Sequence, residues 1–548
     1  MLAKHYRKAG SALALAAIGV ASIGSTANAE EQEDLSSYLV PVINDCTVEC
    51  GFPTFADAEE AAEYLRAYFA NDGQGGAPTG AGGSPEGAGG PSGIGLGLGL
   101  GLNGPQIVYL NFQPGEPTYT YSLFGVTLTL DDYVYTDADK QTVKSRLEAD
   151  YAPYNFEFVL EPPAEGDFVE LQFNSNDAPC AGTAGVCPSG GILFGSAGEI
   201  DFGNDNRSIV AINDANLWPF LNALDPFIGR PEGFLLELNT GIDVAGVLAD
   251  GPDAVSPAEA ARIAVLNQTS NTGAHELGHG LGLRHYDAWG PIGGGLPSTG
   301  TPEPPSFAPL YQGPQDADET ILHLMSSGAS SGLPLSQAAN ADRFLSERSA
   351  IKLAINERGR FITDEQANAG KAGLKKLQVV NPILVGDNAD GRIDVRNIVV
   401  EGRLDELDEI DTLTFDANAG QVFNAELISD VEGAFFPEWD RILGNLELYF
   451  QEADGSLTLV DRNDAEFESL DAFLLDVVLP FSGTYVLQMS APDEFFLGFD
   501  INGDPIILTL SDFFPDVFEW RTGQYIMNAY IVESKNGKGP SKIGGPRK

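Results

Sequence analysis

The segment His275–His285 reads His-Glu-Leu-Gly-His-Gly-Leu-Gly-Leu-Arg-His, and it decides how the central part of this 548-residue chain folds. Residues four apart lie on one face of a helix, so a helix here places His275 and His279 side by side. Gly282 lacks a Cβ and can adopt the left-handed conformation that turns the chain at the end of a helix. That turn is expected to bring His285 back toward the other two imidazoles.

Three imidazoles that converge in this way are suited to hold one metal ion. Zn²⁺ with three protein ligands keeps one or two coordination positions open, which is typical of catalytic rather than structural sites. The ion lowers the pKa of its bound water, and Glu276 is expected to take the proton as that water attacks a carbonyl carbon. The alternative is an ordinary helix with a few polar residues. The chain has only 5 His, and three of them fall at ligand spacing, which argues against a chance match.

The segment resembles the zinc signature of the metzincin metallopeptidases. That family also has a Met-containing turn beneath the metal, and the segment His323–Gly328 matches it, with Met325 as the methionine. The resemblance implies a matrixin-like α+β catalytic domain over residues 105–365, with a twisted mixed sheet and two main helices. It implies one catalytic Zn²⁺, the metal ligands His275, His279 and His285, and the general base Glu276. The alternative for Met325 is that it is an ordinary core methionine. His323 could lie near the substrate, but we favour a structural role for it.

Hydrophobic periodicity predicts a mixed α/β layer around this segment. Strands are expected over residues 107–112, 156–160, 169–173, 192–194 and 208–213. Helices are expected around Val143, Leu147 and Tyr151 and over residues 341–356. A further helix is expected from Ser256-Pro257-Ala258-Glu259 into the histidine segment, either continuous or broken near residues 271–273. We assign the strand at 208–213, by its order alone, to the edge of the sheet that would pair with an extended substrate.

Beyond residue 394 the pattern is all strand and turn, which predicts an all-β sandwich over residues 395–533, after a linker over 366–394. The segments 411–415, 461–464 and 479–487 resemble the pre-peptidase C-terminal domains of secreted bacterial peptidases. The resemblance implies an accessory module that aids secretion, folding or substrate attachment. The basic tail, residues 534–548, is expected to be disordered.

The first 29 residues predict an export signal. Three cations precede an apolar stretch over residues 12–23, which is too short to span a bilayer, and Ala27-Asn28-Ala29 follows as a cleavage pattern. The mature protein is therefore expected to be secreted, without membrane insertion. Residues 30–71 form a candidate pro-segment, and residues 72–104 a flexible Gly-rich linker.

The four Cys lie in two close pairs, Cys46 with Cys50 and Cys180 with Cys187, which in an exported chain favours two short disulfide loops. Other pairings stay open. The sequence Cys50-Gly51-Phe52-Pro53 also resembles the matrixin cysteine switch, in which a pro-segment thiolate occupies the open metal position. The two interpretations of Cys50 exclude each other.

The formal net charge is −49 at pH 7, which argues against nucleic acid or an anionic membrane as a partner. Acidic surfaces bind calcium in some proteins, but the segment Gly386–Gly391 lacks the spacing of an EF-hand and is interpreted as an acidic turn. Calcium elsewhere stays open. The chain is expected to be a monomer. Its expected partner is a protein or peptide substrate.

These features together predict a secreted zinc-dependent endopeptidase that acts on extracellular proteins. One alternative is an adhesion protein in which the sandwich binds and the metal site is vestigial, although the intact Glu276 argues against it. Another is a zinc amidase with a non-protein substrate, because the chemistry at the carbonyl is shared.

Overall fold

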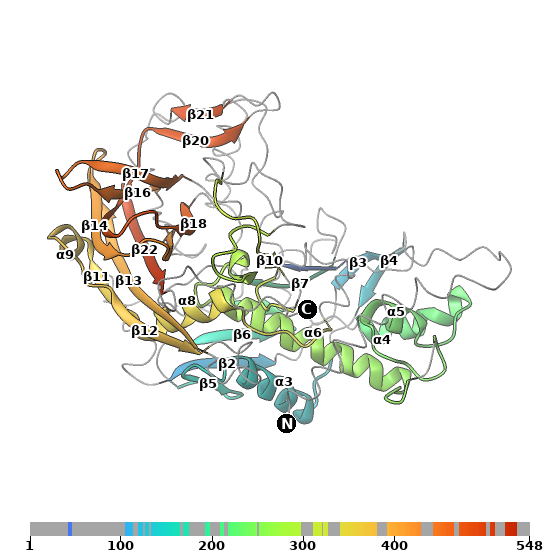
Figure 1. The fold of residues 1–548 in the computed structure, drawn as a ribbon. Helices are drawn as coiled ribbons and strands as arrows, with labels where there is room; N and C mark the ends of the chain where they lie inside the picture. Colours follow the sequence, from blue (N-terminus) through green and yellow to red (C-terminus); the bar gives the residue numbers. More distant parts are fainter. Residues whose placement is uncertain are drawn as a thin grey trace.

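The computed structural model describes the larger part of the chain between residues 42 and 533 (Figure 1). The described residues are 42–45, 105–112, 119–123, 126–130, 133–164, 168–174, 192–197, 209–212, 217–248, 251–297, 311–319, 322–326, 340–380, 392–428, 442–464, 471–499, 505–509 and 521–533. The predicted signal, the Gly-rich linker, the four Cys, the acidic turn at 386–391 and the basic tail lie outside them.

A six-stranded mixed sheet forms the N-terminal half, in the order β1-β7-β8-β6-β2-β5. Its strands are β1 (Val42–Asp45), β2 (Gln106–Phe112), β5 (Phe156–Val159), β6 (Val169–Phe173), β7 (Ile192–Ala197) and β8 (Ile209–Ile212). The strands β5, β2, β6 and β8 are parallel, whereas β7 runs antiparallel to β8. Separate hairpins are formed by β3 (Tyr119–Leu123) with β4 (Val126–Leu130) and by β9 (Trp289–Gly290) with β10 (Asp318–Glu319).

The prediction that the strand at 208–213 is the sheet edge is wrong. That strand is β8, and it lies inside the sheet because β7 pairs with its outer side. The outer side of β7 in turn pairs in parallel with β1, with Val42 opposite Ile192 and Asp45 opposite Gly195. Chain order alone could not reveal that β7 returns antiparallel on the outside of β8.

Two long helices cover this sheet and contact each other, α3 (Asp137–Asp150) and α6 (Pro257–His279) (Figure 1). The start of α6 is as predicted: the Ser256 side chain accepts a hydrogen bond from the Glu259 amide, and Pro257 is the first helical residue. The helix is continuous through residues 271–273. The shorter helices nearby are α4 (Leu217–Leu224), η2 (Asp225–Ile228), α5 (Phe234–Thr240) and η3 (His285–Ala288).

The helix predicted at 341–356 is α8 (Glu347–Arg358), which starts later, with Ser346 as its N-cap. The residues before Ser346 are not helical because the Phe344 backbone pairs with Leu322 and Leu324. After α8 come β11 (Phe361–Thr363) and α9 (Asp364–Asn368).

The C-terminal part is rich in β-structure and contains two larger sheets. One has the order β11-β13-β22-β15-β18, with β12 on β13, and the other has the order β14-β19-β16-β17. Their strands are β12 (Lys375–Val380), β13 (Arg392–Leu404), β14 (Ile410–Ala417), β15 (Val422–Ile428), β16 (Asn445–Gln451), β17 (Leu457–Asn463), β18 (Phe473–Val478), β19 (Gly483–Ser490) and β22 (Gly523–Val532). A hairpin of β20 (Glu494–Phe499) and β21 (Pro505–Thr509) follows β19. The expected linker at 366–394 thus contains β12.

The two halves share a hydrophobic core. One buried cluster joins Val108 and Leu171 of the first sheet, Ile351 of α8, and Val399 and Tyr530 of the second sheet. The helix α8 contacts β12 and β13, and it lies between the two halves (Figure 1). A second cluster fills the space between the two C-terminal sheets. In the part of the chain that the structure describes, no helix is long and apolar enough to cross a membrane.

Candidate metal centre

The last turn of α6 carries His275 and His279, and the turn after the helix returns the chain as predicted. Gly282 has a φ of 86°, and the Leu283 amide donates to the Gly278 carbonyl at 2.9 Å, a bond that closes the helix end. The first residue of η3 is then His285. The turn at Gly282 therefore reverses the chain and brings His285 back toward the end of α6.

The three imidazoles form a group that could hold a metal ion, because one ring nitrogen of each lies within 4.8 Å of those of the other two. The Nε2 atoms of His275 and His279 are 3.2 Å apart. Tetrahedral Zn²⁺ with bonds of about 2.1 Å would separate two nitrogens by about 3.4 Å, so the spacing fits. All three side chains are buried, with exposures of 1%, 1% and 4% for His275, His279 and His285.

Backbone carbonyls orient the two helix ligands. The Nδ1 atom of His275 lies 2.5 Å from the Leu324 carbonyl oxygen, and that of His279 lies 2.8 Å from the Leu283 carbonyl oxygen. A carbonyl can only accept, so Nδ1 carries the proton in both rings and Nε2 keeps its lone pair. Each ring is therefore in the tautomer that can bind a metal through Nε2.

Met325 packs beneath the helix turn that carries these ligands. A Cβ added at Gly278, between the two His, would lie 2.4 Å from the Met325 sulfur. Met325 is fully buried, and Leu324 beside it supplies the carbonyl that orients His275. Met325 therefore lies against the helix turn between His275 and His279.

Glu276 lies between α6 and β7 and is fully buried. A Cβ added at Gly195 of β7 would lie 2.4 Å from the Glu276 Oε1 atom. The carboxylate thus contacts the backbone of the strand that pairs with β1, and a glycine makes room for it.

The residues around His285 make contacts that the sequence did not predict. The guanidinium of Arg284 lies 2.5 Å from the Asp471 carboxylate, and the Tyr286 hydroxyl donates to Glu426 at 2.7 Å. Burial raises the pKa of Asp287 to about 6, and the nearby Lys352 ammonium opposes this rise. Three side chains on either side of His285, those of Arg284, Tyr286 and Asp287, therefore contact distant parts of the chain.

His323, beside the Met turn, is buried, and its Nδ1 atom donates to the Ala288 carbonyl. Burial lowers its pKa to about 4, which keeps the ring neutral. The ring joins the Met turn to the loop after His285, as expected for a structural histidine.

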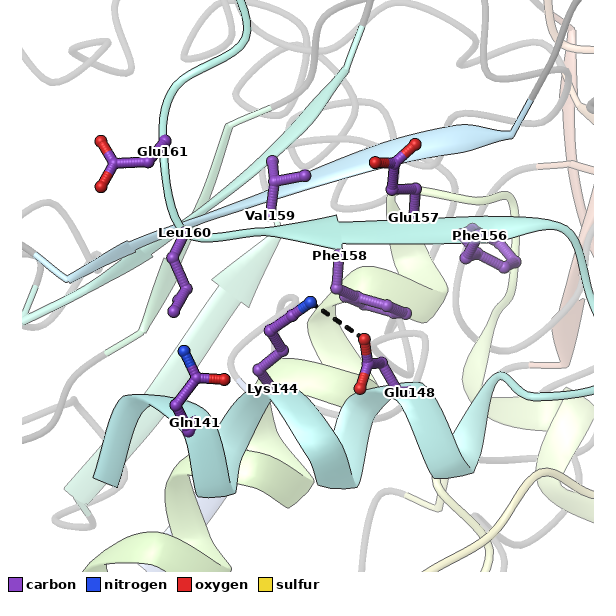
Figure 2. Close-up of a pocket in the computed structure, with 9 residues that line it drawn as sticks. All are labelled: Gln141, Lys144, Glu148, Phe156, Glu157, Phe158, Val159, Leu160 and Glu161. Atoms are coloured by element: carbon purple, nitrogen blue, oxygen red, sulfur yellow. Dashed lines mark hydrogen bonds and ion pairs between the residues drawn. The ribbon is translucent and has the colours of Figure 1, made fainter. Parts of the chain in front are cut away.

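A separate open cavity of 530 Å³ lies between α3 and the sheet-edge strand β5 (Figure 2). An ion pair between Lys144 and Glu148, with a separation of 3.0 Å, lies along the α3 side of this cavity, beside Phe158 of β5. None of the three His, nor Glu276, lines this cavity. It is therefore not part of the candidate metal centre.

Comparisons with known proteins give no family for the chain. Neither a protein-family model nor a curated protein matches it. Solved structures match part of it, among them PliG of Aeromonas hydrophila, a periplasmic inhibitor of g-type lysozyme. That match has 12% identity and a TM-score of 0.13, and it covers 32% of this chain and 98% of PliG. A TM-score this low carries no argument about fold or function.

Proposed function

We propose that the chain is a secreted zinc-dependent endopeptidase of the metzincin type that hydrolyses peptide bonds of extracellular proteins. The observation that carries the proposal is the buried three-His cluster with Glu276 on the same helix turn. A three-nitrogen ligand set leaves coordination positions open, as a catalytic site requires. Imidazole suits several transition metals, and we select Zn²⁺ because three neutral His are a common catalytic zinc set.

Bound Zn²⁺ supplies Lewis acidity, which polarises a carbonyl and lowers the pKa of water. Glu276 accepts the proton of the attacking water and passes it to the amine that leaves. Its burial excludes bulk water from this proton transfer. The Nδ1 bonds of His275 and His279 keep both rings in the metal-binding tautomer during the reaction.

The outer side of β7 is the surface that we propose for the substrate backbone. It pairs with β1, which supports the view that this edge accepts an extended strand through main-chain hydrogen bonds. Glu276 contacts the same strand at Gly195, opposite Asp45 of β1. A peptide in the place of β1 would therefore run beside the general base.

This placement also supports latency, because β1 belongs to the candidate pro-segment at 30–71. While β1 pairs with β7, the chain itself fills the position proposed for the substrate. Removal of the segment before residue 105 is then the activating step. Main-chain pairing suffices for this, whatever the state of Cys50.

The test is casein hydrolysis by the purified protein, before and after proteolytic removal of the segment that precedes residue 105. Activity should appear after removal, disappear with a zinc chelator, return with Zn²⁺, and be absent in Glu276→Gln. Metal content by mass spectrometry must show one zinc in both the wild type and the variant. If the processed wild type holds zinc and cleaves neither casein nor a peptide library, the endopeptidase proposal fails.

A further inference from the structure

The third ligand site lies on a segment whose position is set by tertiary contacts. We call residues Arg284–Ile292 the metal loop. His275 and His279 belong to a continuous helix, whereas His285 follows the left-handed Gly282 and the short helix η3. The position of His285 thus depends on what holds the metal loop.

The first contact is an ion pair at the start of the loop. Arg284 and Asp471 approach to 2.5 Å, and both side chains are buried. Asp471 lies just before β18 of the second sheet. The Arg284 amide also donates to Asp287 at 2.8 Å, which folds the loop around His285.

The second contact is made by Tyr286. Its ring stacks on Phe473 of β18 with centroids 4.1 Å apart and an angle of 21° between the planes. Its hydroxyl donates to Glu426 of β15 at 2.7 Å. A hydrophobic cluster joins Tyr286 and Trp289 of the loop with Phe473 and Leu475.

The third contact runs through α8. The Lys352 ammonium lies 2.8 Å from Asp287 and 2.9 Å from Glu426, and all three side chains are buried. The carboxylate of Glu426 therefore binds the loop twice, once through Tyr286 and once through Lys352 and Asp287. Loss of one partner would leave a buried charge without compensation, so the network favours a single loop position.

We infer that the C-terminal sheet that contains β15 and β18 is an integral part of the metal centre. Glu426 and Asp471 act as positioning residues for the third ligand, His285. The inference rests on metal binding by the three His, which is part of the proposed function. It differs from the accessory role implied by the resemblance of the C-terminal part. The affinity for the metal therefore depends on Glu426 of β15 and on Asp471, just before β18.

The test measures zinc affinity of the full chain by competition with a chromophoric chelator. Asp471→Asn and Glu426→Gln keep the size of each side chain and remove its charge. We expect each to weaken zinc binding about 10- to 100-fold, the range found for residues that orient metal ligands. Asp416→Asn is the matched control, because Asp416 pairs with Lys371 on the surface of the same C-terminal part. It should leave the affinity unchanged.

Tyr286→Phe provides a milder variant if a carboxylate variant does not fold. It keeps the ring against Phe473 and removes only the hydrogen bond to Glu426. We expect zinc binding to weaken a few-fold, and the visible spectrum of the Co²⁺-loaded protein to shift. Unchanged affinity and spectrum in Tyr286→Phe, or unchanged affinity in folded Asp471→Asn and Glu426→Gln, would overturn the inference.

Zinc affinity separates this inference from the proposed function. If the wild type binds zinc but hydrolyses nothing, the endopeptidase proposal fails and the affinities of the variants still decide the inference. If the wild type binds no zinc, both fail together. If the processed wild type is active and the variants bind zinc normally, only the inference fails.

Discussion

The metal centre combines two kinds of support, one local and one distant in the chain. His275 and His279 lie one turn apart on α6, and the Leu283 carbonyl, four residues after His279, orients the second of these rings. His285 lies on the metal loop, whose Tyr286 bonds to a residue 140 positions further along the chain. The comparison teaches that helical spacing fixes two of the ligand sites, whereas the third depends on how the two halves pack.

The largest expected effect comes from breaking the distant support at Lys352. In Lys352→Met the carboxylates of Asp287 and Glu426 remain buried without their shared cation. We expect the free energy of unfolding of the metal-free protein to fall by about 3–5 kcal/mol. Urea unfolding followed by fluorescence measures this change.

The control for Lys352 is Lys144→Met, which removes the partly exposed pair with Glu148 at the cavity of Figure 2. Its effect should be below about 1 kcal/mol. Equal losses in the two variants would mean that the buried network contributes no more than a surface pair.

The next effect tests the local support. His279→Ala removes one of the three imidazoles, and we expect zinc to bind about 100- to 1,000-fold more weakly, because each ligand contributes a few kcal/mol. Chelator competition measures the constant. Thr240→Ala is the control, since Thr240 is also a buried polar residue, but its side chain bonds to Leu236 and Ile242 around α5, away from the three His and the metal loop. A comparable loss of affinity in Thr240→Ala would contradict the assignment of the ligands.

Gly195→Ala tests the role of Glu276 as general base independently of the three His. The added Cβ would meet Glu276 at 2.4 Å and Thr272 at 2.6 Å, so the carboxylate must move. A displacement of this size is expected to lower kcat/KM about 100-fold. Zinc affinity should stay near that of the wild type. The control is Gly373→Ala, because Gly373 is exposed and an added Cβ there would meet only the flexible end of Arg360. Unchanged activity in both variants would refute a close approach of Glu276 to β7.

The same contrast explains what the sequence could predict. The start of α6 at Ser256, the turn at Gly282 and the placement of His275 and His279 on one face of the helix follow from interactions within a few residues, so the sequence alone predicts them. The expected strand at 169–173 is β6, and that at 156–160 is β5 to within one residue, for the same reason.

Interactions between distant segments were not accessible from the sequence. The inner position of β8 follows from the return of β7, and the pairing of β7 with β1 joins residues far apart in the chain. Arg348 and Lys352 lie four apart on α8, a spacing that also suits an exposed helix face. Only the second sheet, with Asp476 and Glu426, shows why these two cations are buried.

The smallest expected effect is on the free energy of unfolding and comes from Asp150, at the end of α3. Asp150 ends α3, next to Tyr151, whose hydroxyl donates to the Ala274 carbonyl just before His275. Burial and the charge of Asp342 raise the pKa of Asp150 to about 8, and Arg146 opposes the rise. In the unfolded chain an Asp titrates near pH 4, at about 3.9. The folded protein therefore binds more protons between these values, and this contribution to stability falls as pH rises from about 4 to 8.

Asp150→Asn removes this titration, so the variant should match the wild type near pH 4 and exceed it by about 1 kcal/mol at pH 8 to 9. Unfolding of the metal-free proteins in urea across this pH range measures the difference. Zinc affinity serves as the second readout and should not change, because the substitution leaves the bond from the Tyr151 hydroxyl to the Ala274 carbonyl in place. A stability difference that is constant with pH, or that shrinks as pH rises, would show that Asp150 is ionised in the folded protein and that its burial places no strain on this end of α3.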